Sequence, residues 1–256
     1  MPTLFLRPVN YFLENNNERI SFNELLNHTI TIQWTGNIFC ILCGQKTPKT
    51  YGEGMCYKCF ATAPENSECI IHPELCKAHL HEGRDPEWEE KNHNKPHFVY
   101  LAYTSEVKVG VTRATQIPTR WIDQGATAAI LLAETPYRQK AGEIEVFLKN
   151  YFPDKTRWDA MLQNQQNGSA LILSAKEKAL KVLPPEFMKY IYNSDELIEL
   201  EYPVQNYPIK VNAINLTQVQ AFKLPLTGIK GQYLYFDSDK VFNVRRHSGY
   251  EVEIMW

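Results

Sequence analysis

Long hydrophobic runs and an excess of charge of one sign are both missing from this chain of 256 residues. No apolar stretch is long enough to cross a membrane, which takes about 20 residues. The first twenty residues, MPTLFLRPVNYFLENNNERI, also lack the continuous apolar segment and small-residue cleavage site of a signal peptide. We therefore expect a cytoplasmic protein, in a reducing compartment where cysteine pairs bind metal rather than oxidise.

The formal net charge is only −2, which excludes a strong global attraction to polyanions. Binding to nucleic acid would have to come from a local basic patch. The hydrophobic content of 44% is enough for a substantial core. At this length we expect an α+β protein made of several small domains.

Four cysteines form the most specific motif in the chain. Cys40-x-x-Cys43 and Cys56-x-x-Cys59 are separated by twelve residues. Each pair can direct two thiolates at one ion, and the loop between them is long enough to fold back and complete a tetrahedron. Gly44 suits the turn around the first pair. The pattern predicts a structural zinc site, because four thiolates leave no open position for water or substrate. Two disulfides or four separate buried thiols are the alternatives.

A second group of metal-binding residue types follows directly. Cys69 and Cys76 lie in CIIHPELC, and five histidines occur nearby. We expect a second zinc ion, bound by Cys69, Cys76, His81 and His93, with His79 and His97 as substitutes. One alternative has surface histidines and packed cysteines without metal. Another has three protein ligands and a water, which would make the site hydrolytic.

The hydrophobic pattern divides the chain into segments. Residues 1–39 alternate like strands, as in Thr29–Trp34, with a polar turn at Asn15–Asn17. Residues 40–96 are rich in Cys, His, Pro and charge and predict a zinc-binding region with two sites. The remaining segments are predicted to be a small α/β domain at 97–155, connecting helices at 156–196 and a β-rich domain at 197–256 that packs with 1–39.

Within 97–155 the pattern predicts two strands, HFVYLAYT and SEVKVGVT, with a tight turn at Ser105 and Glu106. A helix should cover 117–124, a strand 126–134 and an amphipathic helix 139–152. Helices are also expected over 155–166 and 175–192, the latter interrupted at Pro184 and Pro185. From Leu197 onward, short alternating runs predict a β sandwich or barrel.

Residues 97–152 resemble the GIY-YIG endonuclease domain. The resemblance rests on Phe98-Val99-Tyr100 in a first strand, Lys108 to Arg113 around Gly110 in a second, Arg120-Trp121 in a helix and Glu145 in a later helix. It implies a three-stranded sheet with flanking helices and a metal-dependent nuclease. The two Cys/His groups together with VYLA, VKVGVTR and PTRWIDQGA also resemble an uncharacterised bacterial family of zinc-binding proteins, over nearly the whole chain.

The nuclease resemblance implies a role for each matching residue. Tyr100, Arg120 and Glu145 would be catalytic: Glu145 would hold Mg²⁺ or Mn²⁺, Arg120 would contact the phosphate, and Tyr100 would position or deprotonate the water. Lys108, Gly110 and Arg113 would bind substrate. Lys108 stands where the family has its second tyrosine, and Gln124 stands where histidine or tyrosine is common. Taken separately, Tyr100 also fits a packed strand aromatic, Arg120 a partner of Asp123, and Glu145 a solvated helix residue.

The partner expected from these motifs is nucleic acid, DNA or RNA. Three functions remain open: a metal-dependent nuclease, a nucleic-acid-binding module that has lost catalysis, and a protein-interaction adaptor in which zinc is scaffolding. In the second, aromatic and basic side chains of the β segments would add contacts, among them Tyr233, Tyr235, Arg245, Arg246 and His247.

Overall fold

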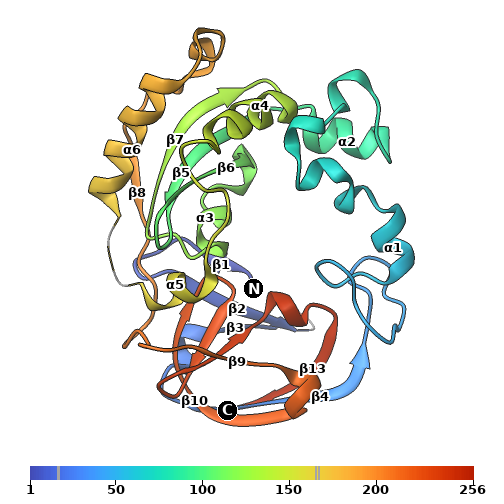
Figure 1. Cartoon of the computed structure of the whole chain (residues 1–256). Coiled ribbons are helices and arrows are strands. Elements are labelled where there is room, and N and C mark those ends of the chain that lie inside the picture. Colours follow the sequence, from blue (N-terminus) through green and yellow to red (C-terminus); the bar gives the residue numbers. More distant parts are fainter. Residues whose placement is uncertain (16–17, 165, 167) are drawn as a thin grey trace. The chain divides into compact units, whose positions relative to one another are not determined.

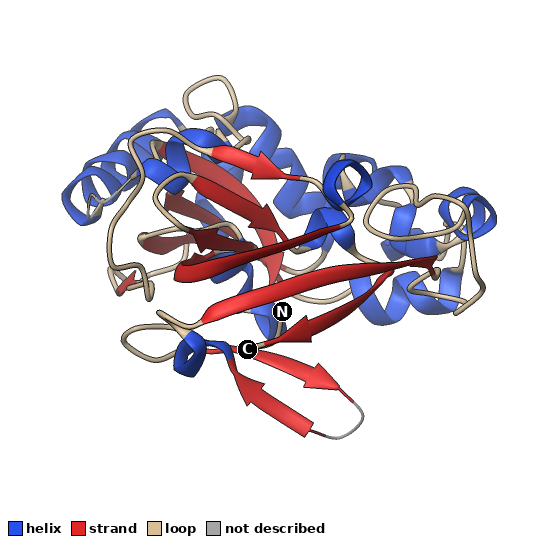
Figure 2. Ribbon diagram, turned by 90° about the horizontal axis from the view of Figure 1, so that it is seen from below, coloured by secondary structure: helices blue, strands red, loops and turns tan. Residues whose placement is uncertain are grey.

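The computed structural model describes residues 1–15, 18–164, 166 and 168–256. Helices and strands are mixed along the chain (Figure 2), as the expected α+β class requires. The chain divides into two compact units (Figure 1): unit 1 contains residues 1–61 and 201–256, and unit 2 contains residues 62–200. Among the described residues, no helix is both long enough and apolar enough to cross a membrane.

Unit 1 consists mainly of strands. They are β1 (Thr3–Leu4), β2 (Asn10–Asn15), β3 (Glu18–Ser21), β4 (Thr29–Ile38), β9 (Asn212–Ile214), β10 (Ala221–Lys230), β11 (Tyr233–Phe236), β12 (Lys240–Asn243) and β13 (Tyr250–Met255). In the described part of this unit they form a three-stranded sheet, β1-β2-β3, and a six-stranded sheet, β13-β4-β10-β11-β12-β9. Two short helices, α1 (Tyr57–Thr62) and α7 (Leu216–Val219), complete the unit.

Strand β4 joins the two ends of the sequence in one sheet. It pairs antiparallel with β10 on one side and with β13 on the other. Its alternation buries Ile30 and Ile32, as a strand with one covered face requires. The expected sandwich or barrel is thus observed as a six-stranded sheet that includes an amino-terminal strand. The expected turn at Asn15–Asn17 includes residues 16 and 17, which lie outside the described residues.

Unit 2 is an α/β unit. Its strands are β5 (His97–Tyr103), β6 (Val107–Arg113), β7 (Ala128–Thr135) and β8 (Leu197–Glu199), and its helices are α2 (Pro86–His93), α3 (Thr119–Asp123), α4 (Arg138–Leu148), α5 (Trp158–Gln163) and α6 (Ser169–Val182). The sheet order is β6-β5-β7-β8, and all neighbours are antiparallel. Short 3₁₀ helices occur in both units: Phe22–Leu25, Pro64–Asn66, Glu68–Ile70, Pro73–Leu75, Ala78–Leu80, Ala114–Gln116, Pro185–Tyr190 and Arg245–His247.

The strand and helix predictions for this region are confirmed at β5, β6, β7 and α4. Helix α6 begins earlier than expected, at Ser169, and ends at Val182, just before the two prolines. The run from Leu197, expected to open the carboxy-terminal β region, instead pairs as β8 with β7. The predicted three-stranded sheet therefore has a fourth strand, which covers the edge that β7 would otherwise expose.

The core of unit 2 lies on one face of its sheet. Val99 and Leu101 of β5 pack with Ile144 and Leu148 of α4 and with Ile172 of α6, and all five are fully buried. Because side chains alternate across a strand, Phe98, Tyr100 and Ala102 point to the opposite face. On that second face Trp121 of α3 packs edge-on against Tyr100, with ring centroids 5.9 Å apart.

Candidate functional site

The four-cysteine cluster, Cys40, Cys43, Cys56 and Cys59, lies in unit 1, in the segment that runs from the end of β4 into α1, which carries Cys59. The four Sγ atoms all lie within 4.8 Å of one another. Cys40 is buried, whereas Cys43 is exposed. The motif predicted from the spacing is thus assembled in space, and it is compatible with zinc.

Local backbone geometry brings the four sulfurs together. Gly44 has a φ of +70°, a left-handed conformation that glycine adopts without strain. This turn lets the Gly44 amide donate to the Cys40 carbonyl at 2.9 Å, while the Cys40 amide donates to Gln45. The second pair follows a bridge between Tyr51 and Met55. The first Cys-x-x-Cys segment is therefore a tight turn, and the second forms the first turn of α1, where the Phe60 amide donates to the Cys56 carbonyl at 2.9 Å.

The sulfur spacing fits a tetrahedral zinc ion. Two sulfurs that each lie about 2.3 Å from such an ion are about 3.8 Å apart. The Cys43 and Cys56 sulfurs are separated by 3.9 Å. Burial raises the pKa of Cys40, but backbone hydrogen bonds from Cys43, Cys56 and Leu42 outweigh it and lower the value to about 6. Cys40 is thus favoured as a thiolate, the form that binds metal, whereas burial and hydrogen bonding with the other three cysteines raise the pKa of Cys59.

The mixed cluster, Cys69, Cys76, Glu89 and His93, lies in unit 2 and is fully buried. His93 Nδ1 is 3.7 Å from the Cys69 sulfur and 3.6 Å from the Cys76 sulfur. A sulfur and a nitrogen on one tetrahedral zinc ion are about 3.6 Å apart. Two thiolates, an imidazole and a carboxylate at this spacing are compatible with zinc.

Helix α2 supplies two of these four side chains. Asp85 caps it by accepting a hydrogen bond from the Trp88 amide at 3.0 Å, and Pro86 occupies its first turn. Glu89 and His93 are four residues apart and therefore lie on the same face. The Arg84 amide donates to Glu89 Oε1 at 3.1 Å. This bond leaves Oε2, 3.7 Å from His93 Nδ1, facing the cluster.

The two thiols of the mixed cluster are strongly coupled. Hydrogen bonding from Cys76, with smaller contributions from His93 and Ser67, lowers the pKa of Cys69 to about 4 despite its burial. The same interaction with Cys69, together with burial, raises the pKa of Cys76. Without metal the pair thus holds one thiolate and one thiol. A bound cation would replace the remaining proton.

Three histidines proposed from the sequence lie outside the mixed cluster. His81, the predicted fourth ligand, has a side chain 73% exposed with Nδ1 3.4 Å from a Glu90 carboxylate oxygen. The 3₁₀ turn Ala78–Leu80 ends at His81 in a left-handed conformation, and Glu89 takes the place assigned to His81. The His79 ring stacks on the Tyr137 ring, with the ring centroids 4.4 Å apart. His97 is fully buried, and its Nδ1 bonds to the Lys95 carbonyl at 2.7 Å.

Tyr100 and Gly110 are direct partners across β5 and β6. A Cβ atom on Gly110 would lie 2.5 Å from the Tyr100 hydroxyl, so glycine is needed here because the phenol ring fills the space. The hydroxyl donates to Gln124 Oε1 at 3.1 Å. Burial raises the pKa of Tyr100, and the Arg120 charge and the hydrogen bonds with Gln124 and Arg120 only partly offset this effect. At neutral pH Tyr100 is a protonated hydrogen-bond donor.

Lys108 shares this face of the sheet, because it pairs with Ala102, two residues from Tyr100. Its side chain is buried. Burial, helped by the Arg120 charge, lowers the pKa of Lys108 to about 8, while Asp154 and Glu145 act in the opposite direction. Tyr100, Lys108 and Arg120 thus form one electrostatically coupled group.

Glu145 approaches this group from a different element. It lies on α4 and is 8% exposed, with Oε2 3.7 Å from Lys149 Nζ. Its charge acts on both Tyr100 and Lys108. Burial raises the pKa of Glu145, and Asp154 raises it further, against the opposing charge of Lys149. Glu145 is thus a buried carboxylate held beside a cation rather than a solvated helix residue.

Arg113, which was predicted to bind substrate, contacts helix α2 instead of the Tyr100 group. It donates to Asn92 Oδ1 of α2 at 2.5 Å. This bond ties β6 to the helix that carries Glu89 and His93. The structure therefore gives Arg113 a contact with the zinc region.

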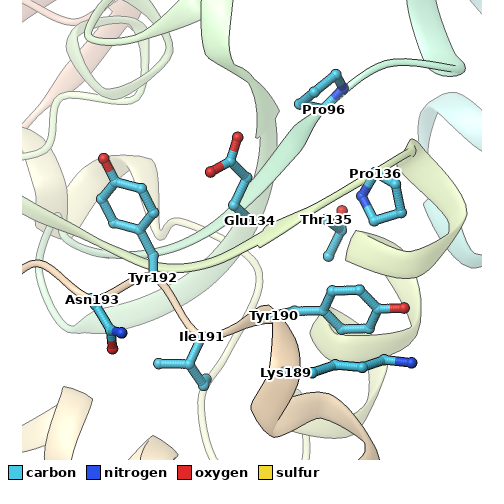
Figure 3. A pocket seen from close by; sticks show the side chains of 9 residues that line it. All are labelled: Pro96, Glu134, Thr135, Pro136, Lys189, Tyr190, Ile191, Tyr192 and Asn193. Carbon is cyan, nitrogen blue, oxygen red and sulfur yellow. The ribbon is translucent and has the colours of Figure 1, made fainter.

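A pocket of about 340 Å³ opens at the end of β7 (Figure 3). Lys189 and Tyr190 extend on one side of it, and Glu134 and Tyr192 on another (Figure 3). The residues that line it are Pro96, Glu134, Thr135, Pro136, Lys189, Tyr190, Ile191, Tyr192 and Asn193. None of these lining residues belongs to either cysteine cluster or to the Tyr100 group.

Glu89 is the main residue that sequence reasoning missed. Asp85-Pro86 signals a helix start, and on that helix Glu89-x-x-x-His93 has the spacing that puts two ligands on one face. Reading 85–93 as a helix would have selected Glu89 instead of a histidine from the preceding loop.

A search of curated proteins found no match, and a search of solved structures found none either. One family model matches residues 27–252, which include both cysteine clusters and the whole of unit 2. Its description is "Protein of unknown function (DUF2797)". The match spans most of the chain, and this protein therefore belongs to the DUF2797 family.

Proposed function

We propose that this protein binds nucleic acid and that residues 97–155 form a GIY-YIG-like unit that hydrolyses phosphodiester bonds. The observation that carries the proposal is that Tyr100 of β5 and Lys108 of β6 share one face of the sheet, with Arg120 of α3 and Glu145 of α4 near enough to affect the pKa of both. Three cations or donors and one carboxylate are the groups needed to bind a phosphate and a divalent ion. The two zinc clusters act as structural supports.

The groups on the second sheet face would bind the substrate. Arg120 is half-buried on α3 and offers a fork of donors that matches a phosphate. Lys108, still largely cationic at neutral pH, adds a second positive charge. Tyr100, protonated because burial raises its pKa, would orient a phosphate oxygen or a water through its hydroxyl rather than remove a proton. For this the Tyr100 hydroxyl has to exchange its bond to Gln124 for one to substrate.

Glu145 is the carboxylate that would hold Mg²⁺ or Mn²⁺. A divalent ion supplies Lewis acidity, polarising the phosphate and lowering the pKa of a bound water. Lys149 at present balances the charge of Glu145 and lies 3.2 Å from Asp154 as well. Asp154 can therefore retain its ion pair with Lys149 when a divalent ion replaces Lys149 beside Glu145.

The test uses labelled DNA and RNA with Mg²⁺ or Mn²⁺. The wild type should cleave. Glu145→Ala should lower the rate by at least 100-fold, because the loss of a metal ligand removes on the order of 3 kcal/mol of transition-state stabilisation. Arg120→Ala should lower both the rate and the affinity for nucleic acid. The matched control is Glu143→Ala, on the same helix, whose carboxylate pairs with Lys140 at 2.8 Å.

Two other outcomes separate the alternatives. Salt-dependent binding without cleavage, weakened by Arg120→Ala, would identify a nucleic-acid-binding module without catalysis. That outcome has structural support, because Tyr100 is 1% exposed and bonded to Gln124. Absence of both binding and cleavage would refute the proposal and favour the adaptor.

A further inference from the structure

One face of α4 packs against the loop that carries Cys69 and Cys76. Arg138, Gly142, Glu145 and Lys149 recur at intervals of four, three and four residues, so they form one stripe along the helix. This stripe is separate from the core stripe that contains Ile144 and Leu148. The helix therefore has a second buried side, whose neighbour is the Cys69–Cys76 loop (Figure 1).

Two contacts fix the helix to this loop. Arg138 Nε donates to the Cys69 carbonyl at 2.9 Å, and its terminal nitrogen donates to the Ile70 carbonyl at 2.9 Å. One turn along, a Cβ on Gly142 would lie 2.2 Å from the backbone nitrogen of Glu74. Only glycine permits this approach. The contact brings the Glu74 backbone against Gly142, which lies one helical turn before Glu145 on α4.

Glu74 has an oxygen that the described residues leave unsatisfied. Oε1 lies 3.3 Å from His72 Nδ1. Oε2 is buried and, among the described residues, has no hydrogen-bond partner. Burying a carboxylate oxygen without a partner is unfavourable, so this atom calls for a ligand.

We propose that Glu74 and Glu145 together form the binding site for a divalent cation, with the Cys69–Cys76 loop holding Glu74 in place. This rests on the proposed function and adds a second protein ligand to the ion assigned to Glu145. Glu74 meets α4 at Gly142, one helical turn before Glu145, so it lies beside the stripe of the helix that carries Glu145. Mg²⁺ and Mn²⁺ take carboxylate oxygens and keep several waters.

The site links the two metals of unit 2. Zinc at the mixed cluster would fix the loop, the loop would fix Glu74, and Glu74 with Glu145 would complete the second site. Lys149, 3.7 Å from Glu145, is the cation that a divalent ion has to displace. Its removal should therefore strengthen binding of the divalent ion.

The experiment measures Mn²⁺ binding to the zinc-loaded full chain by electron paramagnetic resonance. Glu74→Gln and Glu145→Gln should each weaken binding at least tenfold, and Lys149→Met should strengthen it severalfold. The control is Glu82→Gln, because Glu82 lies in the same region, is largely exposed and pairs with Lys77 at 3.2 Å. Zinc content, measured by mass spectrometry, should stay the same in all four variants.

Each further outcome is decisive. Unchanged Mn²⁺ affinity in Glu74→Gln, with weakening in Glu145→Gln, overturns the role of Glu74 and leaves the proposed nuclease intact. Mn²⁺ binding that needs both carboxylates, without cleavage of nucleic acid, supports the site and refutes the nuclease. Absence of Mn²⁺ binding by the wild type overturns the site itself. If the Glu74→Gln variant loses zinc, the Glu74→Asp variant is used in its place, because aspartate keeps the charge on a shorter side chain.

Discussion

The two cysteine clusters use metal-binding residues in different surroundings. The four-cysteine cluster of unit 1 has one buried and one exposed cysteine and lies beside a long, well-paired strand, β4. All four members of the mixed cluster of unit 2 are buried, and the apolar cluster around it consists of Cys69, Cys76 and Ala78 alone among the described residues.

This difference indicates where a bound metal would replace a hydrophobic core. Residues 62–96 bury so few apolar side chains that the candidate ligands themselves form the centre of the segment, and the binding energy of an ion there would become folding energy. In unit 1 the sheet is stabilised by its own core. We therefore expect metal loss to unfold more of unit 2 than of unit 1.

The largest expected effect is that of removing one thiolate from each cluster. Cys76→Ser should lower the free energy of unfolding by roughly 3–5 kcal/mol, because it leaves buried, charged partners without their ion. Cys43→Ser should lose one zinc per chain at a smaller cost, since Cys43 is exposed. Thermal unfolding and zinc content measure both. Equal losses of stability would contradict the distinction between the clusters.

The close packing of α4 on the Cys69–Cys76 loop provides the next test. Gly142→Ala should destabilise the protein by about 1–3 kcal/mol, the usual range for overpacking. The added Cβ would meet backbone at 2.2 Å, and backbone cannot rotate away as a side chain can. Denaturant unfolding measures the change. Lys140→Ala on the same helix is the control and should cost less than about 0.5 kcal/mol.

A third pair of variants tests the ligand set of the mixed cluster. Glu89→Gln should weaken zinc binding at least tenfold, about 1.4 kcal/mol, because it removes the charge of a fully buried ligand. His81→Gln should leave zinc affinity unchanged, since His81 is exposed and pairs with Glu90. Competition with a chelator measures both affinities. The reverse result would restore His81 as the ligand predicted from the sequence.

The smallest effect concerns the buried lysine of each unit. Burial lowers the pKa of Lys230 in unit 1 to about 7, between the rings of Tyr202 and Tyr207, and that of Lys108 in unit 2 to about 8. An unfolded lysine has a pKa of about 10.4. Between these values the unfolded chain binds more protons, so stability should rise with pH by at most about 1.4 kcal/mol per unit for each lysine.

Lys230→Met should remove the part of this slope that begins near pH 7, and Lys108→Met the part that begins near pH 8. Unfolding by denaturant at pH 7, 8 and 9 measures it. A wild-type slope that persists in both variants would show that other groups cause it.

Local sequence patterns predicted the regular elements well. The alternation in 97–113 gave β5 and β6, and the amphipathic pattern after Gln139 gave α4. Pro184 and Pro185 correctly indicated the interruption after α6. These succeed because they depend on period, turn residues and missing amide donors, which a single segment contains.

Long-range pairing and the second ligand set were harder. β8 has the same short alternating pattern as the other runs after Leu197, and only the open edge of β7 decides where it pairs. For the mixed cluster, seven histidines in the chain offered too many combinations. The fold selects among them by burying His93 and exposing His81.

The sequence alone determined the four-cysteine cluster, since two tight turns position their own thiols and a single loop closes the tetrahedron. Only the tertiary structure decided that Glu89 joins Cys69, Cys76 and His93, and that Glu74 lies against α4. The physical reason is burial. A carboxylate becomes a ligand when packing removes it from water and places it beside other charges, and that depends on residues far away in the chain.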